Sequence, residues 1–318
     1  MSVAAHELSA DGSPAVVLLV FNRPEHTRRM LAALREVRPA RIFIVADGPR
    51  PGMADDPARC AEVRRLLETG IDWPADVQRD FAGENMGLRQ RVASGLDWAF
   101  SQVGEAIVLE DDCVADPSFF RYCAELLDRY RDEPRVGAIT GDNFQPAGFA
   151  PGASYYFSRY PHCWGWATWR RAWNCYDDAM VRWPELRDRG WLAELFTVPG
   201  EANYWREIFD QTWSRSRNSW ASAWTFACWS NSLLTAIPRV NLVENIGFDA
   251  EGTHTKADAP WRGRFAARSL EFPLRAPAVI ARDLDADDYT QRYIFERVRR
   301  RAFPFLEWFS LRRLLPRR

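Results

Sequence analysis

Lysine is almost absent from this chain of 318 residues, since Lys256 is the only lysine among 42 basic residues. We attribute the arginine excess to genome bias, although the fork of arginine also suits phosphate groups. The 43 acidic residues bring the net charge to -1. The chain therefore lacks the basic footprint of a protein that binds nucleic acid.

Paired cysteines and long hydrophobic runs are also missing. The six cysteines form no CxxC pair or metal-ligand ladder, so we expect buried thiols in a reducing compartment. No apolar run reaches the roughly 18 residues that span a bilayer. Residues 1–14 lack the basic and apolar regions of a signal peptide. We therefore expect a cytoplasmic protein.

The first third of the chain alternates apolar runs with helical patterns. The strands expected here are 15–21, 41–46, 77–81 and 105–109, and the helices are 24–37, 57–69 and 88–101. This alternation predicts an α/β fold with a mostly parallel sheet. Beyond residue 112 we expect a helix over 117–130, a strand over 136–140, and helices near 165–173, 203–213 and 220–233.

Tryptophan is concentrated in the second half of the chain. Eleven of the 15 tryptophans lie between Trp164 and Trp229. Such a cluster forms a core, a binding surface or both, because indole rings pack well and also offer an apolar face to a sugar ring. We expect most of them to be core and only a few to meet a ligand.

Three consecutive acids, Glu110, Asp111 and Asp112, follow the fourth expected strand. Ligands bind at the carboxyl ends of strands in open parallel sheets. Adjacent carboxylates repel one another unless a cation lies among them, and Mg²⁺ or Mn²⁺ suits one or two carboxylates with phosphate oxygens. A solvated acidic turn is the alternative.

Polar residues after two other strands belong to the same predicted edge. Asp47 could accept a hydrogen bond from a base or a ribose, or it could simply form an Asp-Gly turn. The turn at 83–87 leads into a helix whose first N–H groups suit phosphate, with Arg89 or Arg91 within reach. The alternative is a surface turn with arginines on the helix face.

Two motifs of the second half also suggest a ligand. Gly165, between Trp164 and Trp166, would let the backbone approach a ligand closely. His254 lies in a loop rich in glycine and threonine, where it could be a metal or phosphate ligand or an ordinary surface histidine.

Seven motifs in register resemble bacterial family-2-like glycosyltransferases of the GT-A fold and, more distantly, the N-acetylglucosaminyltransferase I group. They are Asn22-Arg-Pro, Ala46-Asp-Gly-Pro, Asn85-Met-Gly-Leu, Leu109-Glu-Asp-Asp, Cys163-Trp-Gly-Trp, Asn245-Ile-Gly-Phe and Thr253-His-Thr. The resemblance covers roughly residues 15–256 and implies a Rossmann-type nucleotide-binding sheet fused to a Trp-rich acceptor region. Residues 14–112 would bind the nucleotide sugar, 113–260 the acceptor, and 261–318 would form a basic extension.

The resemblance also implies roles for single residues. Phe21, Asn22 and Arg23 would line the nucleotide pocket, Asp47 would contact uracil, and Arg89 would face the phosphates. Glu110 and Asp111 would belong to a DxD-like element, with Asp111 near the donor ribose or sugar. Asp112 and His254 would hold Mn²⁺ or Mg²⁺. Trp164, Gly165 and Trp166 would border the sugar and the acceptor.

The implied reaction is metal-dependent, inverting transfer of a sugar from a nucleotide-diphosphate donor, expected to be a UDP-sugar, to a glycan or a lipid-linked acceptor. Related sequences carry an acid near the segment 218–224, but this chain has none there. The candidate bases are Asp210, Glu207, Asp249 and Glu251. The alternatives are a retaining enzyme, a nucleotidyltransferase that makes NDP-sugars, or a catalytically weak binding protein.

The segment 289–318 alternates arginine clusters with large apolar residues. This composition is typical of an amphipathic element on an anionic membrane. It would hold the enzyme peripherally at the inner face of the cell membrane, near a lipid-linked acceptor. A terminal helix packed on the body of the protein is the alternative.

Overall fold

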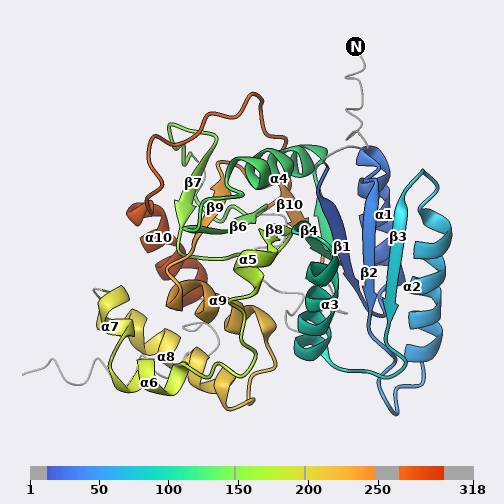
Figure 1. Cartoon of the computed structure of the whole chain (residues 1–318), viewed down its shortest axis with the longest axis horizontal. Helices are drawn as coiled ribbons and strands as arrows, with labels where there is room; N and C mark the ends of the chain where they lie inside the picture. Colours follow the sequence, from blue (N-terminus) through green and yellow to red (C-terminus); the bar gives the residue numbers. More distant parts are fainter. Residues whose placement is uncertain (1–12, 147, 197, 248–264, 297–318) are drawn as a thin grey trace, which may run out of the picture.

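One central sheet runs through the computed structural model, which describes residues 13–146, 148–196, 198–247 and 265–296 (Figure 1). Its strand order is β3-β2-β1-β4-β8-β6-β9-β7. These strands are β1 (Ala15–Val20), β2 (Arg41–Ala46), β3 (Asp76–Phe81), β4 (Glu105–Glu110), β6 (Val136–Thr140), β7 (Tyr155–Ser158), β8 (Trp166–Trp169) and β9 (Leu234–Pro238). The predicted α/β class is therefore confirmed.

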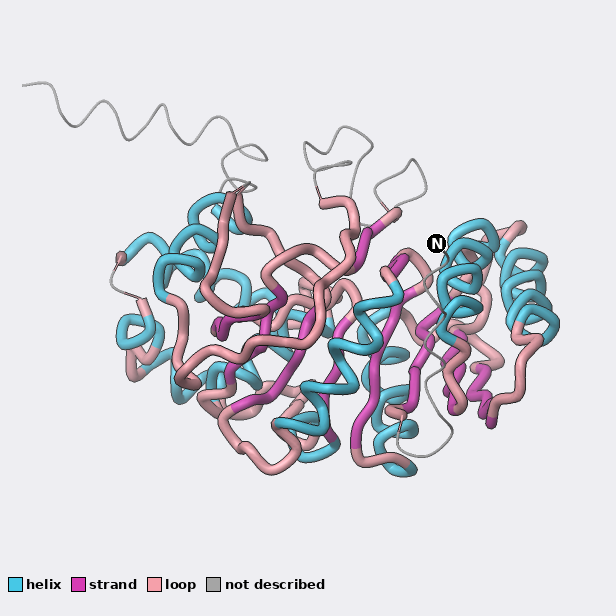
Figure 2. The backbone as a smooth tube through the Cα atoms, turned by 90° about the horizontal axis from the view of Figure 1, so that it is seen from above, coloured by secondary structure: helices cyan, strands magenta, loops and turns pink. Residues whose placement is uncertain are grey.

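The N-terminal part of the sheet is parallel, because β1 pairs in parallel with both β2 and β4, and β2 with β3. Helices lie on both sides of the sheet (Figure 2). They include α1 (Pro24–Val37), α2 (Asp56–Gly70), α3 (Leu88–Gln102) and α4 (Pro117–Arg129). Val16 and Leu18 pack in the core formed with α1, α2 and α4, whereas Val17 packs with α3. This burial of both faces explains the continuous apolar run of β1.

The Trp-rich half adds strands to the same sheet and a group of helices beside it. Its helices are α5 (Arg170–Trp173), α6 (Trp183–Asp188), α7 (Leu192–Leu195), α8 (Pro199–Trp213) and α9 (Trp220–Ser230). Trp166, Trp220 and Trp224 pack against one another in the core, with ring centroids 5.6 Å apart from Trp166 to each of the other two. Most tryptophans of the cluster are thus core residues, as expected.

The helix expected near residues 165–173 is wrong over its first half. Trp166–Trp169 forms β8, which is antiparallel between β4 and β6, and only residues 170–173 are helical. Trp166 and Trp169 pack in the cores on opposite faces of the sheet. Burial of both faces of a central strand suits this aromatic and β-branched sequence better than a helix does.

A short two-stranded antiparallel ribbon lies at the carboxyl end of β4. It pairs β5 (Cys113–Ala115), which follows the three acids directly, with β10 (Val243–Asn245) from the far end of the second half. This ribbon was not predicted. Its pairing brings residues 245–247 to the carboxyl end of β4, because Ile246 N–H donates to the Asp112 carbonyl at 2.8 Å.

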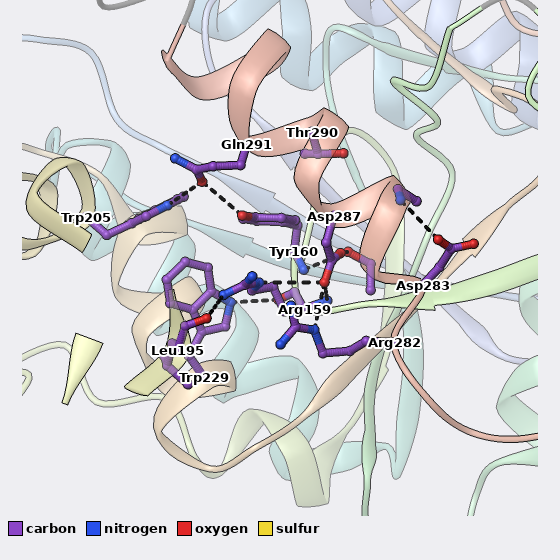
Figure 3. Close-up of polar contacts among 12 residues, drawn as sticks. Arg159, Tyr160, Leu195, Trp205, Trp229, Arg282, Asp283, Asp287, Thr290 and Gln291 are labelled. Atoms are coloured by element: carbon purple, nitrogen blue, oxygen red, sulfur yellow. Dashed lines mark hydrogen bonds and ion pairs between the residues drawn. The ribbon is translucent and has the colours of Figure 1, made fainter. Parts of the chain in front are cut away.

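The C-terminal described segment ends in α10 (Leu284–Thr290) and the π-helix η1 (Gln291–Glu296). Asp287 of α10 is 1% exposed and accepts hydrogen bonds from Ser158 and Arg282 (Figure 3). Gln291 accepts hydrogen bonds from Tyr160 and Trp205. Residues 282–291 of the expected basic extension 261–318 therefore pack into the protein, whereas residues 261–264 and 297–318 lie outside the described residues. No helix within the described ranges is long and apolar enough to cross a membrane.

Candidate active site

A cavity of about 600 Å³ lies at the carboxyl ends of β1, β2 and β4. Strands that run parallel place the residues that follow them at one edge of the sheet. Carboxylates and arginines both line this cavity, among them Glu110, Asp111 and Asp112 and also Arg50, Arg59 and Arg91. The site thus offers groups of both charges to a ligand.

The three acids at the carboxyl end of β4, of which Glu110 is the last residue of the strand, lie near Arg23, which directly precedes α1. We name Arg23, Glu110, Asp111 and Asp112 the acidic corner. The Arg23 guanidinium lies 2.8 Å from Asp111 Oδ1 and 3.0 Å from Asp112 Oδ2. Asp111 also accepts a hydrogen bond from the Phe21 N–H at 3.4 Å. The predicted grouping of these residues at one edge of the sheet is therefore observed.

Burial and mutual repulsion shift the ionisation of the acidic corner. Burial, followed by the charges of Asp112 and Asp111, raises the pKa of Glu110 to about 8, although Arg23 and a hydrogen bond from Trp220 oppose the shift. Burial also raises the pKa of Asp111 to about 6 against the attraction of Arg23. Burial would lower the pKa of Arg23, but the carboxylates outweigh it and raise that pKa. The three acids therefore compete for one guanidinium, and the raised pKa values of Glu110 and Asp111 favour their neutral forms.

Asp112 is the member of the corner that faces the β5–β10 ribbon. A Cβ atom on Gly247 would lie 2.3 Å from Asp112 Oδ2 and 3.1 Å from Asn245 Oδ1. Only a glycine leaves room for the carboxylate at this position. Asn245 in turn accepts the Gly247 N–H at 2.8 Å, which fixes the turn around Asp112. Asn245 and Gly247 both line the cavity.

The donor set fits Mg²⁺ or Mn²⁺ bound together with a ligand, rather than in a cage built by protein alone. No group of three His, Cys, Asp or Glu side chains in the described part of the chain could hold a metal ion by itself. The Arg23 guanidinium stands between Asp111 and Asp112, where the sequence predicts a cation. Mg²⁺ commonly uses one or two carboxylates and completes its shell with phosphates and water. Asp112, which lines the cavity, suits that role.

Asp47 lines the cavity, but its carboxylate is already used by the protein. It accepts hydrogen bonds from the N–H groups of Gly48, Met86 and Gly87 and from the Asn85 amide, at 2.8 to 3.0 Å. The carboxylate therefore holds the turn that leads into α3. Contact of Asp47 with uracil stays a prediction, and any such contact must share these oxygens.

The arginines of α3 have separate tasks. Arg89 is buried and does not line the cavity, because it donates to the Asp178 carboxylate and to the Thr212 carbonyl at 2.7 Å. It joins the two halves of the chain and is not placed to face phosphate. Arg91 lines the cavity but pairs with Asp80 at 2.8 Å. Residues two apart on a helix point in nearly opposite directions, which explains the difference.

Two further arginines, which sequence reasoning missed, line the cavity after β2. Arg50 binds the buried Asp56 through two nitrogens, at 2.6 and 2.9 Å, and its guanidinium lies 5.4 Å from the centroid of the Phe21 ring. Asn22 also donates to Asp56, at 2.7 Å. Phe21 and Asn22, which were expected in the nucleotide pocket, thus contact Arg50 and Asp56 at one wall of the cavity. Arg59 also lines the cavity. The nearby Asp47-Gly-Pro motif was the only signal for this wall.

Of the three expected sugar-side residues, only Trp164 lines the cavity. Its backbone N–H donates to the buried Asp142 carboxylate at 2.9 Å, and its ring packs edge-on against Phe144. Trp166 is 1% exposed and belongs to the core. Gly165 serves packing rather than ligand approach: its φ is 70°, and a Cβ there would lie 2.7 Å from Val243.

Asn218 is a cavity residue that sequence reasoning did not select. It lies between α8 and α9 and is exposed, and a Cβ on Gly87 would lie 3.8 Å from its amide nitrogen. It therefore lies directly beside Gly87, which precedes α3. Together with Trp164, Asn218 brings the Trp-rich half to the site.

The candidate bases do not converge on the cavity in the described part of the chain. Asp210 accepts hydrogen bonds from Trp183 at 3.0 Å and Arg187 at 3.3 Å, and neither Asp210 nor Glu207 lines the cavity. Asp249, Glu251 and the predicted metal ligand His254 lie outside the described residues. In the sequence they follow Gly247, which does line the cavity.

No known protein family matches this chain, and no curated protein matches it either. Among solved structures the chain is similar to TarS 1–349 from S. aureus, with a TM-score of 0.41 and 10% sequence identity. The match covers 72% of this chain and 59% of that chain, so it spans less than two thirds of the TarS structure. So low a similarity says nothing about chemistry, which has to come from the cavity itself.

Proposed function

We propose that the chain is a glycosyltransferase that transfers a hexose from a nucleotide-diphosphate donor, most simply a UDP-sugar, to a glycan or a lipid-linked acceptor. The observation that supports this proposal best is the cavity of about 600 Å³, where the acidic corner and several arginines meet Trp164. A volume of 300–1,000 Å³ is typical of small-molecule sites. Anionic phosphates, a cation and an apolar sugar face would each find a partner there.

The wall after β1 and β2 would take the nucleoside, with Phe21 and Arg50 offering an aromatic face and a planar cation. The acidic corner would take the diphosphate end of the donor. Mn²⁺ or Mg²⁺ bound by Asp112 would supply charge stabilisation to the departing nucleoside diphosphate. Arg23 is placed beside the same group and would add a second positive charge.

The sugar would then lie toward Trp164 and Asn218, which the Trp-rich half contributes. Trp164 offers its indole to the C–H face of the ring, and the Asn218 amide can donate to and accept from sugar hydroxyls. In an inverting transfer, a carboxylate removes the proton of the acceptor hydroxyl while the bond from sugar to phosphate breaks. We assign this task to Asp249 or Glu251 rather than to Asp210, which is held by Trp183 and Arg187.

A nucleotide-binding protein without turnover is the second candidate. It is favoured because the carboxylates that line the cavity in the described ranges all have partners: Asp47 has four donors, Asp111 and Asp112 share Arg23, and Glu110 accepts from Trp220. Binding of UDP with no transfer to any acceptor and no donor hydrolysis would support this candidate over the enzyme.

Thermal unfolding with a panel of nucleoside diphosphates and their sugars, with and without Mn²⁺, tests the proposal. At about 100 times its Kd, a ligand adds about 2.7 kcal/mol to stability. We expect at least one nucleoside diphosphate to raise the unfolding temperature only when Mn²⁺ is present, and the matching sugar donor to be hydrolysed slowly. If no nucleotide stabilises the chain, the proposal is wrong.

Peripheral membrane contact through the basic tail is a separate part of the proposal. Residues 297–318 would hold the enzyme at a lipid surface rich in anionic headgroups. Truncation after Glu296 removes these residues and keeps the buried contacts of Asp287 and Gln291. The full chain should float with anionic liposomes and the truncated chain should not. Equal flotation of both would contradict a membrane role for the tail.

A further inference from the structure

Arg23 occupies the place in the acidic corner where the sequence predicts a metal ion. We propose that Arg23 is an exchangeable counter-ion. In the ligand-free chain it holds Asp111 and Asp112 together, and it turns to the donor diphosphate when a divalent cation binds Asp112. The competition between Arg23 and a metal ion for Asp112 concerns the protein and the metal alone. The turn of Arg23 to the donor diphosphate rests on the proposed function.

The two carboxylates that Arg23 bridges are not equivalent. The Asp111 side chain is 3% exposed and also accepts the Phe21 N–H, so it is a fixed partner. The Asp112 side chain is 14% exposed and lines the cavity, and its Oδ2 packs closely against Gly247, where only a glycine leaves room for it. Asp112 is therefore the partner that can change from a guanidinium to a metal ion with little movement of the protein.

Arg23 itself combines a fixed backbone with a side chain that reaches the cavity. Its carbonyl accepts both the N–H of Thr27 at 3.0 Å and the Thr27 hydroxyl at 2.9 Å, and Pro24 follows as the first residue of α1. The Arg23 side chain is 18% exposed. Rotation about its side-chain bonds would move the guanidinium without moving the helix.

Charge balance makes the exchange favourable only when both ligands are present. A divalent cation at Asp112 would repel the guanidinium 3.0 Å from the same carboxylate, so the metal alone must compete with Arg23. A diphosphate removes this conflict, because its oxygens can bind the metal and also accept two parallel hydrogen bonds from an arginine. Metal and nucleoside diphosphate should therefore strengthen each other's binding.

The test measures binding of Mn²⁺ from the electron paramagnetic resonance signal of the free ion, with and without UDP. Without UDP, Arg23→Gln should bind Mn²⁺ at least about fivefold more tightly than the wild-type chain, because a competing cation is gone. With UDP, the wild-type affinity for Mn²⁺ should rise by at least about fivefold, whereas the rise in Arg23→Gln should be smaller. A purely structural arginine would give equal or weaker Mn²⁺ binding when removed, and that result would overturn the proposal.

Two further variants keep this test decisive. Arg23→Lys retains the charge but cannot bridge both carboxylates, so it should bind Mn²⁺ with intermediate affinity even if Arg23→Gln fails to fold. Wild-type affinity in Arg23→Lys would then contradict the proposal. Arg91→Gln removes a cavity arginine that pairs with Asp80 instead, and it should leave the affinity for Mn²⁺ alone within about twofold.

The two parts of the proposal can fail separately. Tighter Mn²⁺ binding by Arg23→Gln, without any effect of UDP on the wild-type chain, would support the counter-ion role and contradict the nucleotide-diphosphate function. A strong UDP effect that Arg23→Gln retains in full would support that function and contradict the exchange of partners.

Discussion

Two buried ion clusters of this chain have opposite balances of charge. The acidic corner has three carboxylates and one guanidinium beside a cavity of about 600 Å³. The cluster around Asp287 has one carboxylate between Arg282 at 2.7 Å and Arg159 at 3.6 Å, and Ser158 adds a hydrogen bond at 2.5 Å (Figure 3). The buried Asp287 carboxylate is thus more than neutralised by two guanidinium groups, whereas the acids of the corner outnumber their single guanidinium.

The surroundings of the two clusters agree with this difference. The Arg159 guanidinium also donates to the Leu195 carbonyl at 2.8 Å and lies 4.3 Å from the centroid of the Phe196 ring. Gln291 nearby joins Tyr160 to Trp205. These contacts hold the C-terminal segment against the Trp-rich half, and Asp287 does not line the cavity of about 600 Å³. A buried charge indicates a ligand site only where its neutralisation within the protein is incomplete.

The largest expected effect is on stability, at the balanced cluster. Asp287→Ala leaves Arg159 and Arg282 without their buried carboxylate, and removal of one partner of a buried ion pair costs about 3–5 kcal/mol. Urea unfolding should show that loss, while the affinity of the folded protein for UDP with Mn²⁺ stays unchanged. A loss of less than about 1 kcal/mol in the free energy of unfolding would mean that the cluster contributes little to the stability of the fold.

A smaller effect is expected at the acidic corner, where the affinity for a ligand should change. In Gly247→Ala the new methyl group would lie 2.3 Å from Asp112 Oδ2 and push the carboxylate aside. We expect about tenfold weaker binding of UDP with Mn²⁺, or about 1.4 kcal/mol, measured by calorimetry. Gly104→Ala is the matched control, since a Cβ there meets nothing within 4 Å. Equal affinities of the two variants would contradict the placement of Asp112.

The smallest effect concerns the pH dependence of the free energy of unfolding. Burial lowers the pKa of His162, which packs near Tyr160 and Phe295, to about 3. The unfolded chain therefore takes up a proton below about pH 6.5 that the folded chain refuses, so stability falls as the pH falls toward 3. Between pH 7 and 5.5 the wild-type chain should lose about 1 kcal/mol more than His162→Phe in urea unfolding. Identical pH dependence would show that His162 is protonated in the folded state.

The acidic corner should respond to pH in the opposite direction. The pKa of Asp111 and that of Glu110 are raised in the folded chain, to about 6 and about 8. The folded state therefore binds more protons than the unfolded state between about pH 4 and 8, and this contribution to stability is lost as the pH rises. Glu110→Gln should weaken that dependence in urea unfolding between pH 6 and 8. An unchanged slope would contradict the burial of an ionisable Glu110.

The N-terminal half of the fold could be predicted from the sequence because its signals are local. The apolar run of β1 and the proline that opens α1 identify their elements directly. Parallel pairing then brings Arg23, Asp47 and Asp112 to one edge. The second half follows from pairing between distant segments instead. The strand β8 has four residues and takes its conformation from β4 and β6 on either side.

The same distinction explains which site residues sequence reasoning missed. Asn245 and Gly247 belong to one of the seven motifs but had no role assigned; they reach the site because β10 pairs with β5, and Asn218 reaches it from the segment between α8 and α9. No local pattern carries that information. Arg89 was assigned to the phosphates from its place beside a glycine turn, whereas its partners Asp178 and Thr212 come from a distant segment.

Calorimetric titration of UDP in the presence and absence of Mn²⁺, with the wild-type chain, Asp112→Asn and Asp210→Asn, tests the central claim most directly. The claim is that the cavity at the acidic corner binds a nucleoside diphosphate jointly with a divalent cation held by Asp112. We expect the wild-type chain and Asp210→Asn to bind UDP with Mn²⁺ equally well, and Asp112→Asn to bind at least about tenfold more weakly. Equal UDP affinity of Asp112→Asn and the wild-type chain would contradict the account.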